Sequence, residues 1–185
     1  MRDLRSFIDS VVKITETHAL SGAGRYRRWN DAGHDGRRDL SLNAYGCADA
    51  ANILYAIGRF PSENADRTGW IETLRSLQDP CTGFFNEATH HPIHTTAHCI
   101  AALELFDARP AHPLSSLSPL RDPDAMAAFL DALNWRDNPW NASHQGAGLY
   151  AAFVLNGDAG SEWRERYFRW LWDETDPETG FQRKG

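Results

Sequence analysis

Long apolar segments, basic blocks and paired cysteines are all missing from this chain of 185 residues. No segment approaches the roughly 20 apolar residues of a membrane span, and the N-terminus has no apolar run of signal-peptide length. No basic block is long enough to follow a phosphate backbone and the formal net charge is −6, so we expect no nucleic-acid partner. The three cysteines form no Cys-x-x-Cys pair, which indicates reduced thiols in a cytoplasmic protein.

Strand patterns of useful length are also missing, and the apolar residues recur instead at helical spacing. With 42% apolar residues and seven tryptophans, the chain can bury a substantial core as a single domain, residues 1–185. The spacing predicts helices over residues 2–18, 43–59, 63–78, 93–107, 123–134, 143–156 and 160–174. The expected fold class is therefore all-α.

A short signature occurs three times: an aromatic residue, a leucine four positions later, and then an acid or amide followed by proline. The strings at 79–84 and 176–181 both read Asp-Pro-x-Thr-Gly-Phe, whereas the middle copy departs after Pro139. Repetition at intervals of roughly 40–60 residues indicates an array of antiparallel helix hairpins. Because an Asp-Pro-x-x-Gly string suits a turn, Asp79 and Asp176 should each accept backbone hydrogen bonds from the Thr-Gly that follows.

A second pattern, small or polar at the start and apolar later, occurs in the segments 43–59, 93–107 and 143–156. It suits helices whose N-terminal ends face a cavity and whose bodies pack closely against neighbours. When these segments are aligned, Asn43, His94 and His144 take one equivalent position. We therefore expect these three side chains to converge at the mouth of a pocket.

The segment 87–98 is the densest in groups that carry chemistry. His94 and His98 are four residues apart on a predicted helix and share a face. With a carboxylate they could bind a metal, or His94 could transfer protons while Glu87 fixes its tautomer. The alternative is structural, with His94 capping the helix or bonding a neighbouring loop and His98 filling a polar notch in the core. The catalytic candidates are His94 and Glu87, and no metal or cofactor is expected, because the sequence fixes no third ligand.

Three tryptophans precede cavity-facing helices and are candidates for stacking on a ligand, whereas the others fall on outer helices and suit the core. The expected substrate-binding set is Asn43, His98, His144, Trp29, Trp135 and Trp140. Aromatic side chains mixed with histidines and acids suit a sugar or an isoprenoid equally well.

The string Gln78-Asp-Pro-Cys-Thr-Gly-Phe84 resembles the Gln-(Asp/Asn)-Pro-x-x-Gly-x-Phe turn of the α/α-toroid repeat proteins, the group that holds terpenoid cyclases and protein prenyltransferase β-subunits. Phe85, rather than Phe84, takes the spaced position of that motif. The resemblance covers residues 65–106 and, less closely, 125–156 and 160–181. It implies a partial α/α toroid with a pocket at the N-terminal ends of its inner helices.

The helix pairs also resemble the six-hairpin barrels of glycoside hydrolases and polysaccharide lyases, which use an acid pair, or His, Tyr or Asn groups, at the barrel mouth. Protein prenyltransferases hold zinc with Asp-x-Cys and a later His. This chain offers only the reversed order, Cys47-Ala-Asp49, with His98 as a third group. Because residues two apart on a helix point in different directions, the pattern does not favour a metal site.

These observations predict an enzyme-like domain that binds a carbohydrate or an isoprenoid, with a small molecule or an oligosaccharide as its partner. The competing hypothesis is a helical-repeat interaction module without catalysis. Seven helices cannot close a ring of six hairpins, so we expect a domain that is incomplete at its C-terminus or that self-associates. The surface expected to be uncovered is the inner face of helix 160–174, with Trp163, Tyr167, Trp170 and Leu171.

Overall fold

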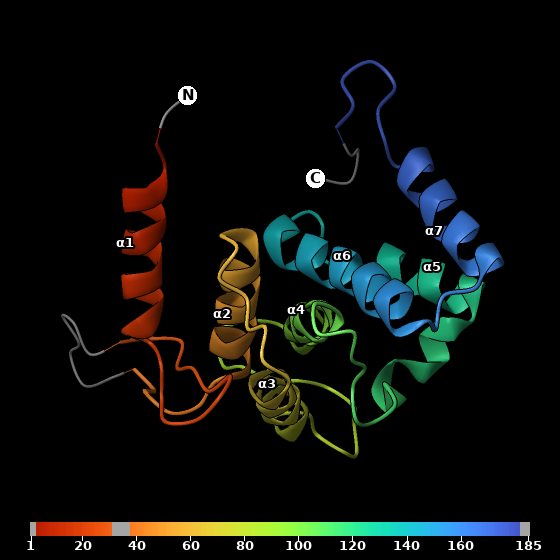
Figure 1. Ribbon diagram of the computed structural model, residues 1–185. Helices are drawn as coiled ribbons and strands as arrows, with labels where there is room; N and C mark the ends of the chain where they lie inside the picture. Colours follow the sequence, from red (N-terminus) through yellow and green to blue (C-terminus); the bar gives the residue numbers. More distant parts are fainter. Residues whose placement is uncertain (1–2, 31–37, 182–185) are drawn as a thin grey trace.

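The computed structural model describes residues 3–30 and 38–181, so residues 31–37 of the first long loop lie outside the described part (Figure 1). Within these segments the protein is helical and has no β-strand, only isolated bridges at Ala19–Tyr26 and Gln78–Phe85. The helices are α1 (Arg5–Glu16), α2 (Ala44–Ala56), α3 (Asn64–Ser76), α4 (Pro92–Glu104), η1 (Ser115–Arg121, 3-10), α5 (Pro123–Ala132), α6 (Pro139–Asn156) and α7 (Ser161–Asp173). The predicted all-α fold class is confirmed.

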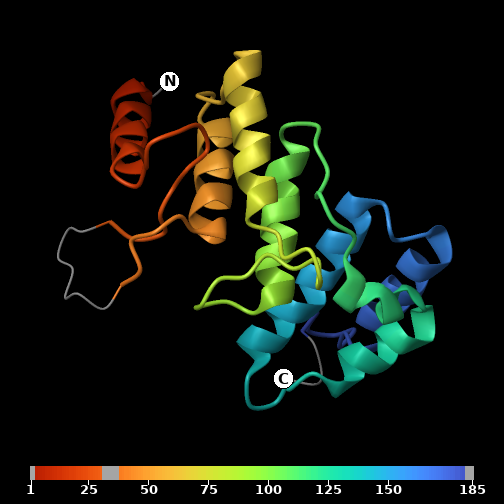
Figure 2. The same ribbon diagram turned by 90° about the horizontal axis from the view of Figure 1, so that it is seen from below.

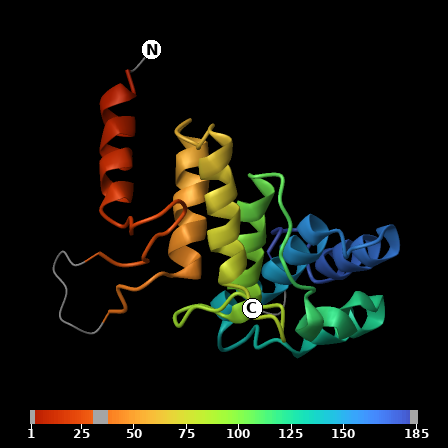
Figure 3. The same ribbon diagram turned by 60° about the horizontal axis from the view of Figure 1, so that its bottom comes forward.

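The helix α4 is the centre of the fold, because it packs against α2 on one side and α6 on the other. The outer helix α3 packs against both α2 and α4 (Figures 2 and 3), and α5 packs against α7 and η1. Figure 1 shows α1 at one end of this arrangement and α7 at the other. Helices of a central row thus alternate along the chain with helices outside it, and the closure of such a row into a toroid stays a prediction. Among the described helices, none has the length and apolar character needed to span a membrane.

Two apolar clusters form the core, one between α2, α3 and α4 and the other between α4, η1, α5, α6 and α7. Helix α4 contributes to both, with Leu103 in the first and Ile100 in the second. Small residues allow the central row to pack closely: a Cβ on Gly148 of α6 would lie 3.2 Å from the Cα of His94. This close approach brings the first turn of α4 and the middle of α6 together.

The repeated Asp-Pro-x-Thr-Gly-Phe strings form the same turn twice. The side-chain oxygen Oδ1 of Asp79 accepts hydrogen bonds from the N–H groups of Cys81 (2.8 Å) and Thr82 (2.9 Å), and Oδ1 of Asp176 accepts the two equivalent bonds at 2.8 and 3.0 Å. The glycine N–H donates to the aspartate carbonyl in both copies, at 2.8 Å. The predicted Asx turn is confirmed, with the correction that the glycine bonds the main chain. Gly83 and Gly180 have φ angles of 78° and 74°, the left-handed region that favours glycine.

The middle copy of the signature has a different role. Asn138 accepts the N–H of Asn141 as the N-cap of α6, and Pro139 is the first residue of that helix. A proline suits this position because the N–H that it lacks would have no partner inside the helix. The helix predicted over 143–156 therefore starts four residues earlier, and the repeat does not extend to this turn.

The aromatic face of α7 is buried rather than uncovered. Trp163, Tyr167 and Trp170 are 3–5% exposed and pack on residues of η1, α5 and α6. The indole of Trp163 donates to the carbonyl of Leu120 (2.8 Å), and the hydroxyl of Tyr167 donates to the carbonyl of Gly146 (3.1 Å). The prediction that this face lacks a cover is wrong, because α7 folds back onto helices that precede it in the chain.

Candidate functional site

Tyr45 and four histidines meet where α2, α4 and α6 come together. The hydroxyl of Tyr45, in the first turn of α2, lies 3.1 Å from Nε2 of His94 on α4. The imidazole of His94 stacks on that of His144 from α6, with ring centroids 4.2 Å apart. The ring of Tyr45 also lies 4.3 Å from His90 and 4.4 Å from His98. We refer to Tyr45, His90, His94, His98 and His144 as the histidine cluster.

The histidine cluster favours neutral imidazoles at its centre. Burial, followed by the charges that His144, His90 and His98 would carry, lowers the pKa of His94 to about 4. Burial also raises the pKa of Tyr45, and a nearby carboxylate adds to this. At neutral pH the Tyr45 hydroxyl therefore keeps its proton and the His94 ring is neutral, so the two groups share one hydrogen bond whose direction follows the tautomer of His94.

Glu87 is the most buried acid of the site, with a side chain only 3% exposed. Its Oε2 lies 3.0 Å from Nδ1 of His90 and 2.7 Å from the hydroxyl of Thr89, and the Arg28 guanidinium is 3.6 Å away. Burial by itself would raise the pKa of Glu87, but the hydrogen bonds from His90 and Thr89 and the charge of Arg28 outweigh it and lower the pKa. Glu87 is thus an ionised acceptor.

The Glu87 carboxylate also sets the tautomer of His90. Nδ1 of His90 lies 3.2 Å from a guanidinium nitrogen of Arg28 as well, but this ring atom cannot accept from Arg28 while donating to Glu87. Because an ionised carboxylate can only accept, the proton of a neutral His90 ring belongs on Nδ1. Nε2 is then the basic atom. The pairing expected between Glu87 and His94 is therefore replaced by a pairing between Glu87 and His90.

A second acid–histidine pair lies on α2 and α4, one helical turn beyond Tyr45 and His94. Asp49 follows Tyr45 by four residues on α2, and its Oδ1 lies 2.8 Å from Nε2 of His98. His98 in turn follows His94 by four residues on α4. Equal spacing on two adjacent helices thus places a tyrosine and an aspartate opposite two histidines.

A hollow of about 510 Å³ lies beside the N-terminal end of α2. Its lining residues are Trp29, Arg38, Asp39, Leu42, Asn43, Ala44, Leu77, Asn86, Glu87, Ala88 and Thr89. The guanidinium groups of Arg28 and Arg38 lie 5.1 and 4.5 Å from the Trp29 ring centroid. Asn43 caps α2 by accepting the N–H of Gly46 at 3.0 Å. The walls combine one indole with carboxylate, amide and guanidinium groups.

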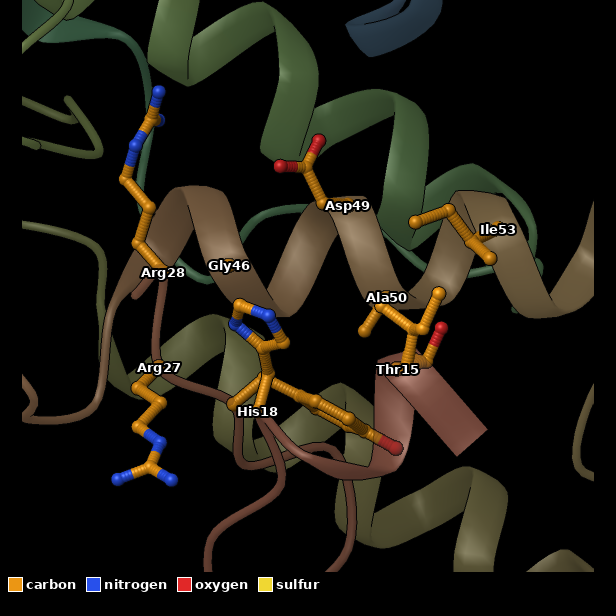
Figure 4. A pocket seen from close by; sticks show the side chains of 10 residues that line it. Thr15, His18, Arg27, Arg28, Gly46, Asp49, Ala50 and Ile53 are labelled. Carbon is orange, nitrogen blue, oxygen red and sulfur yellow. The ribbon is translucent and has the colours of Figure 1, made fainter. Parts of the chain in front are cut away.

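A smaller cavity of about 130 Å³ separates α1 from α2 and contains none of the predicted site residues. Figure 4 shows Thr15 and His18 on the side of α2 that faces α1, and Asp49 pointing to the opposite side. Asp49 therefore faces the histidine cluster while its helix also forms a wall of this cavity.

The structure divides the predicted site residues between the hollow and the histidine cluster, with two tryptophans outside both. Trp29, Asn43 and Glu87 line the hollow, whereas His94, His98 and His144 belong to the histidine cluster. Trp140 is 74% exposed, with its ring 4.5 Å from that of His144 at the edge of the cluster. Asn43 is not equivalent to the two histidines, because it is the N-cap of its helix whereas His91 and Asn138 cap α4 and α6.

Trp135 was expected to stack on a ligand, but it lies in the hydrophobic core. Trp135 is only 8% exposed, and its indole N–H donates to the carbonyl of Leu130 at 2.7 Å. The ring is thus held in the core, where it lines a small cavity of about 110 Å³ with Leu130 and Tyr167. Sequence reasoning missed Tyr45 and Arg28, and the only signal for Tyr45 was its place four residues before Asp49.

No group of three His, Cys, Asp or Glu side chains in residues 3–30 and 38–181 is arranged to hold a metal ion. Comparison of the chain with protein-family models, with curated proteins and with solved structures finds no match.

Proposed function

We propose that this chain is an enzyme-like domain that binds a carbohydrate in the hollow beside Trp29 and transfers protons through Glu87 and His90. The observation that carries the proposal is the double role of Glu87, which lines the hollow and also bonds Nδ1 of His90. The volume of about 510 Å³ supports it, because small-molecule sites commonly measure roughly 300–1,000 Å³.

The polar lining supports a carbohydrate over an isoprenoid. Sugar hydroxyls need many donors and acceptors, which Asp39, Asn86 and Glu87 supply, and an indole such as Trp29 can stack on the apolar face of a sugar ring. An isoprenoid chain needs a continuous apolar wall, and Leu42 and Leu77 are the large aliphatic side chains among the lining residues.

The proposed chemistry is general base catalysis. The Glu87 carboxylate, which lines the hollow, takes a proton from a hydroxyl group of the substrate or from a water molecule, and its bonds to Nδ1–H of His90 and to the Thr89 hydroxyl hold it in place. Tyr45 and His94 form a second proton-carrying pair next to this one. We also propose that α2, α4 and α6 are the inner helices of a partial α/α toroid. A cytoplasmic location is supported by the free state of all three cysteines.

Saturation-transfer NMR with neutral gluco-, manno- and xylo-oligosaccharides, and separately with isoprenoid diphosphates, tests the ligand class. We expect binding of a neutral oligosaccharide that Trp29→Ala abolishes and that Trp172→Ala, a control outside the hollow, leaves intact. Glu87→Gln should retain binding and lose any turnover of the bound sugar. Binding of isoprenoid diphosphates alone, or sugar binding that survives Trp29→Ala, would contradict the proposal.

A non-catalytic interaction module is the second candidate, and exposed aromatic side chains favour it. Trp140 and Trp172 are 74% and 80% exposed, whereas the two core clusters bury Trp70, Trp135, Trp163 and Trp170. Large exposed aromatic residues are enriched where proteins contact partners. Failure of every sugar and isoprenoid probe to bind would favour this candidate.

A further inference from the structure

Trp140 is a tryptophan that the fold leaves exposed on a well-held piece of backbone. It lies in the first turn of α6 and is 74% exposed, whereas Trp135, five residues earlier, is 8% exposed in the core. Asn138 caps this turn by accepting the N–H of Asn141. The hydroxyl of Ser143 donates to the carbonyl of Trp140 at 2.9 Å. The helix therefore fixes the backbone that carries the indole, although the indole itself is not buried.

The Trp140 ring borders the histidine cluster without being covered by it. Its centroid lies 4.5 Å from that of His144, and the two planes are tilted by 55°. The His144 ring stacks on His94, with planes only 9° apart. This contact occupies a small part of the indole, because most of the residue stays exposed. Trp140 thus presents an aromatic surface next to an imidazole.

The surroundings of Trp140 are polar, which distinguishes it from Trp172. Asn141 follows Trp140 in the sequence and His144 lies one helical turn further along, whereas Trp172 lies one turn from Phe168, an aromatic residue that is 54% exposed. The core of a protein interface needs several apolar side chains together. A sugar ring needs one aromatic surface with hydrogen-bonding groups around it. The surroundings of Trp140 therefore favour a sugar.

Trp140 also lies close to the hollow, by way of His90. Glu87 and Thr89 line the hollow, and each has an oxygen within 3.1 Å of Nδ1 of His90. The His90 side chain is 19% exposed and forms part of the surface here. Its ring lies 6.3 Å from that of His144, which is 4.5 Å from Trp140, so the indole is at most about 11 Å from His90. A sugar chain that leaves the hollow past His90 reaches Trp140 within a few rings.

We propose that the substrate is an oligosaccharide that extends from the hollow, past His90, to Trp140, on which one of its outer sugar rings stacks. The inference rests on the proposed function, because the end of the chain that reacts is the one held beside Glu87. Trp140 is remote from that end, so it determines which chain lengths bind and takes no part in the proton transfer. Its contribution to binding is present only in chains long enough to reach it.

Isothermal titration calorimetry of the full chain tests the proposal, with gluco-, manno- and xylo-oligosaccharides from the monosaccharide to the hexasaccharide. In the wild type we expect a Kd that falls as rings are added and levels off once the chain reaches Trp140. Trp140→Ala should raise the Kd of the longest chains about tenfold and leave that of the shortest unchanged. Trp140→Phe, which keeps an aromatic face, should lose less. Trp172→Ala is the matched control, because it removes an equally exposed indole on α7, and it should change no Kd.

The outcomes separate this inference from the proposed function. Trp29→Ala should abolish binding at every length, because Trp29 lies in the hollow itself. If it does, while Trp140→Ala binds long chains as tightly as the wild type, the hollow holds a sugar and the inference is wrong. Equal weakening of short and long chains in Trp140→Ala would also overturn it, because the indole would then act through the shape of the hollow. Failure of every chain to bind the wild type would contradict both.

Discussion

Acidification should destabilise this protein through His94, within a pH window that the histidine cluster defines. The pKa of the folded-state imidazole is about 4, against 6.5 for an unperturbed histidine. Between these values the unfolded chain binds a proton that the folded chain does not. Stability is therefore fully present above pH 6.5 and is lost as the pH falls toward 4. The cause is burial, to which the proximity of His144, His90 and His98 adds.

The magnitude follows from the same two values. A pKa difference of one unit corresponds to about 1.36 kcal/mol, so the interval from 6.5 to about 4 sets an upper limit of about 3.4 kcal/mol. Because the ring remains partly accessible to water, we expect roughly half of this, about 1.5 kcal/mol, in the free energy of unfolding.

Urea unfolding followed by tryptophan fluorescence, at a series of pH values from neutral to about 4.5, measures this loss. The variant His94→Gln keeps a polar group near Tyr45 but cannot titrate, so its stability should fall less than that of the wild type over the window. His112→Gln removes a histidine outside the cluster and should reproduce the wild-type profile. Equal pH dependence in wild type and His94→Gln would refute the reasoning.

Two matched pairs of substitutions test the fold. Gly83→Ala should cost about 3 kcal/mol or more, because its Cβ would clash with the backbone oxygen of Pro113, whereas Gly180→Ala in the equivalent turn meets nothing within 4 Å and should cost about 1 kcal/mol. Thermal and urea unfolding would measure both costs. Both glycines have a positive φ and only Gly83 lacks space for a Cβ, so equal costs would contradict the expected clash with Pro113. Trp135→Ala should cost about 3–5 kcal/mol in the same measurements, while Trp140→Ala should change stability by less than about 0.5 kcal/mol; a small effect at Trp135 would show that it is not a core residue.

The sequence predicted those parts of the fold in which a local pattern corresponds to a single structure. Helical spacing predicted the segments that became α2, α3, α4 and α7, and the Asp-Pro-x-Thr-Gly-Phe strings predicted two equal turns. The dipeptide of an acid or amide followed by proline, in contrast, occurs in two different local structures. At Asp79 it opens a turn that Gly83 closes, whereas at Asn138 it caps a helix, because no Thr-Gly follows. Only the residues after the proline distinguish the two cases.

The site was predicted in part, because its pairings depend on how loops and neighbouring helices approach. The spacing of His94 and His98 correctly gave a shared helix face, but no sequence rule shows that the preceding loop turns His90 toward Glu87. Tyr45 contacts residues 49 positions away, a separation that periodicity cannot reveal. In α7, aromatic residues occur all round the helix, so sequence alone did not tell the buried face from the exposed one.

Chemical-shift mapping of the isotope-labelled protein during titration with the oligosaccharide that binds most tightly tests the central claim most directly. The claim is that the hollow between Trp29 and Glu87 holds the ligand beside the imidazole of His90. We predict changes in the indole signal of Trp29 and in the ring signals of His90 that saturate together, with no change at Trp172. Changes confined to Trp172 and its neighbours on α7, or no change at Trp29 and His90 at saturating sugar, would contradict the account.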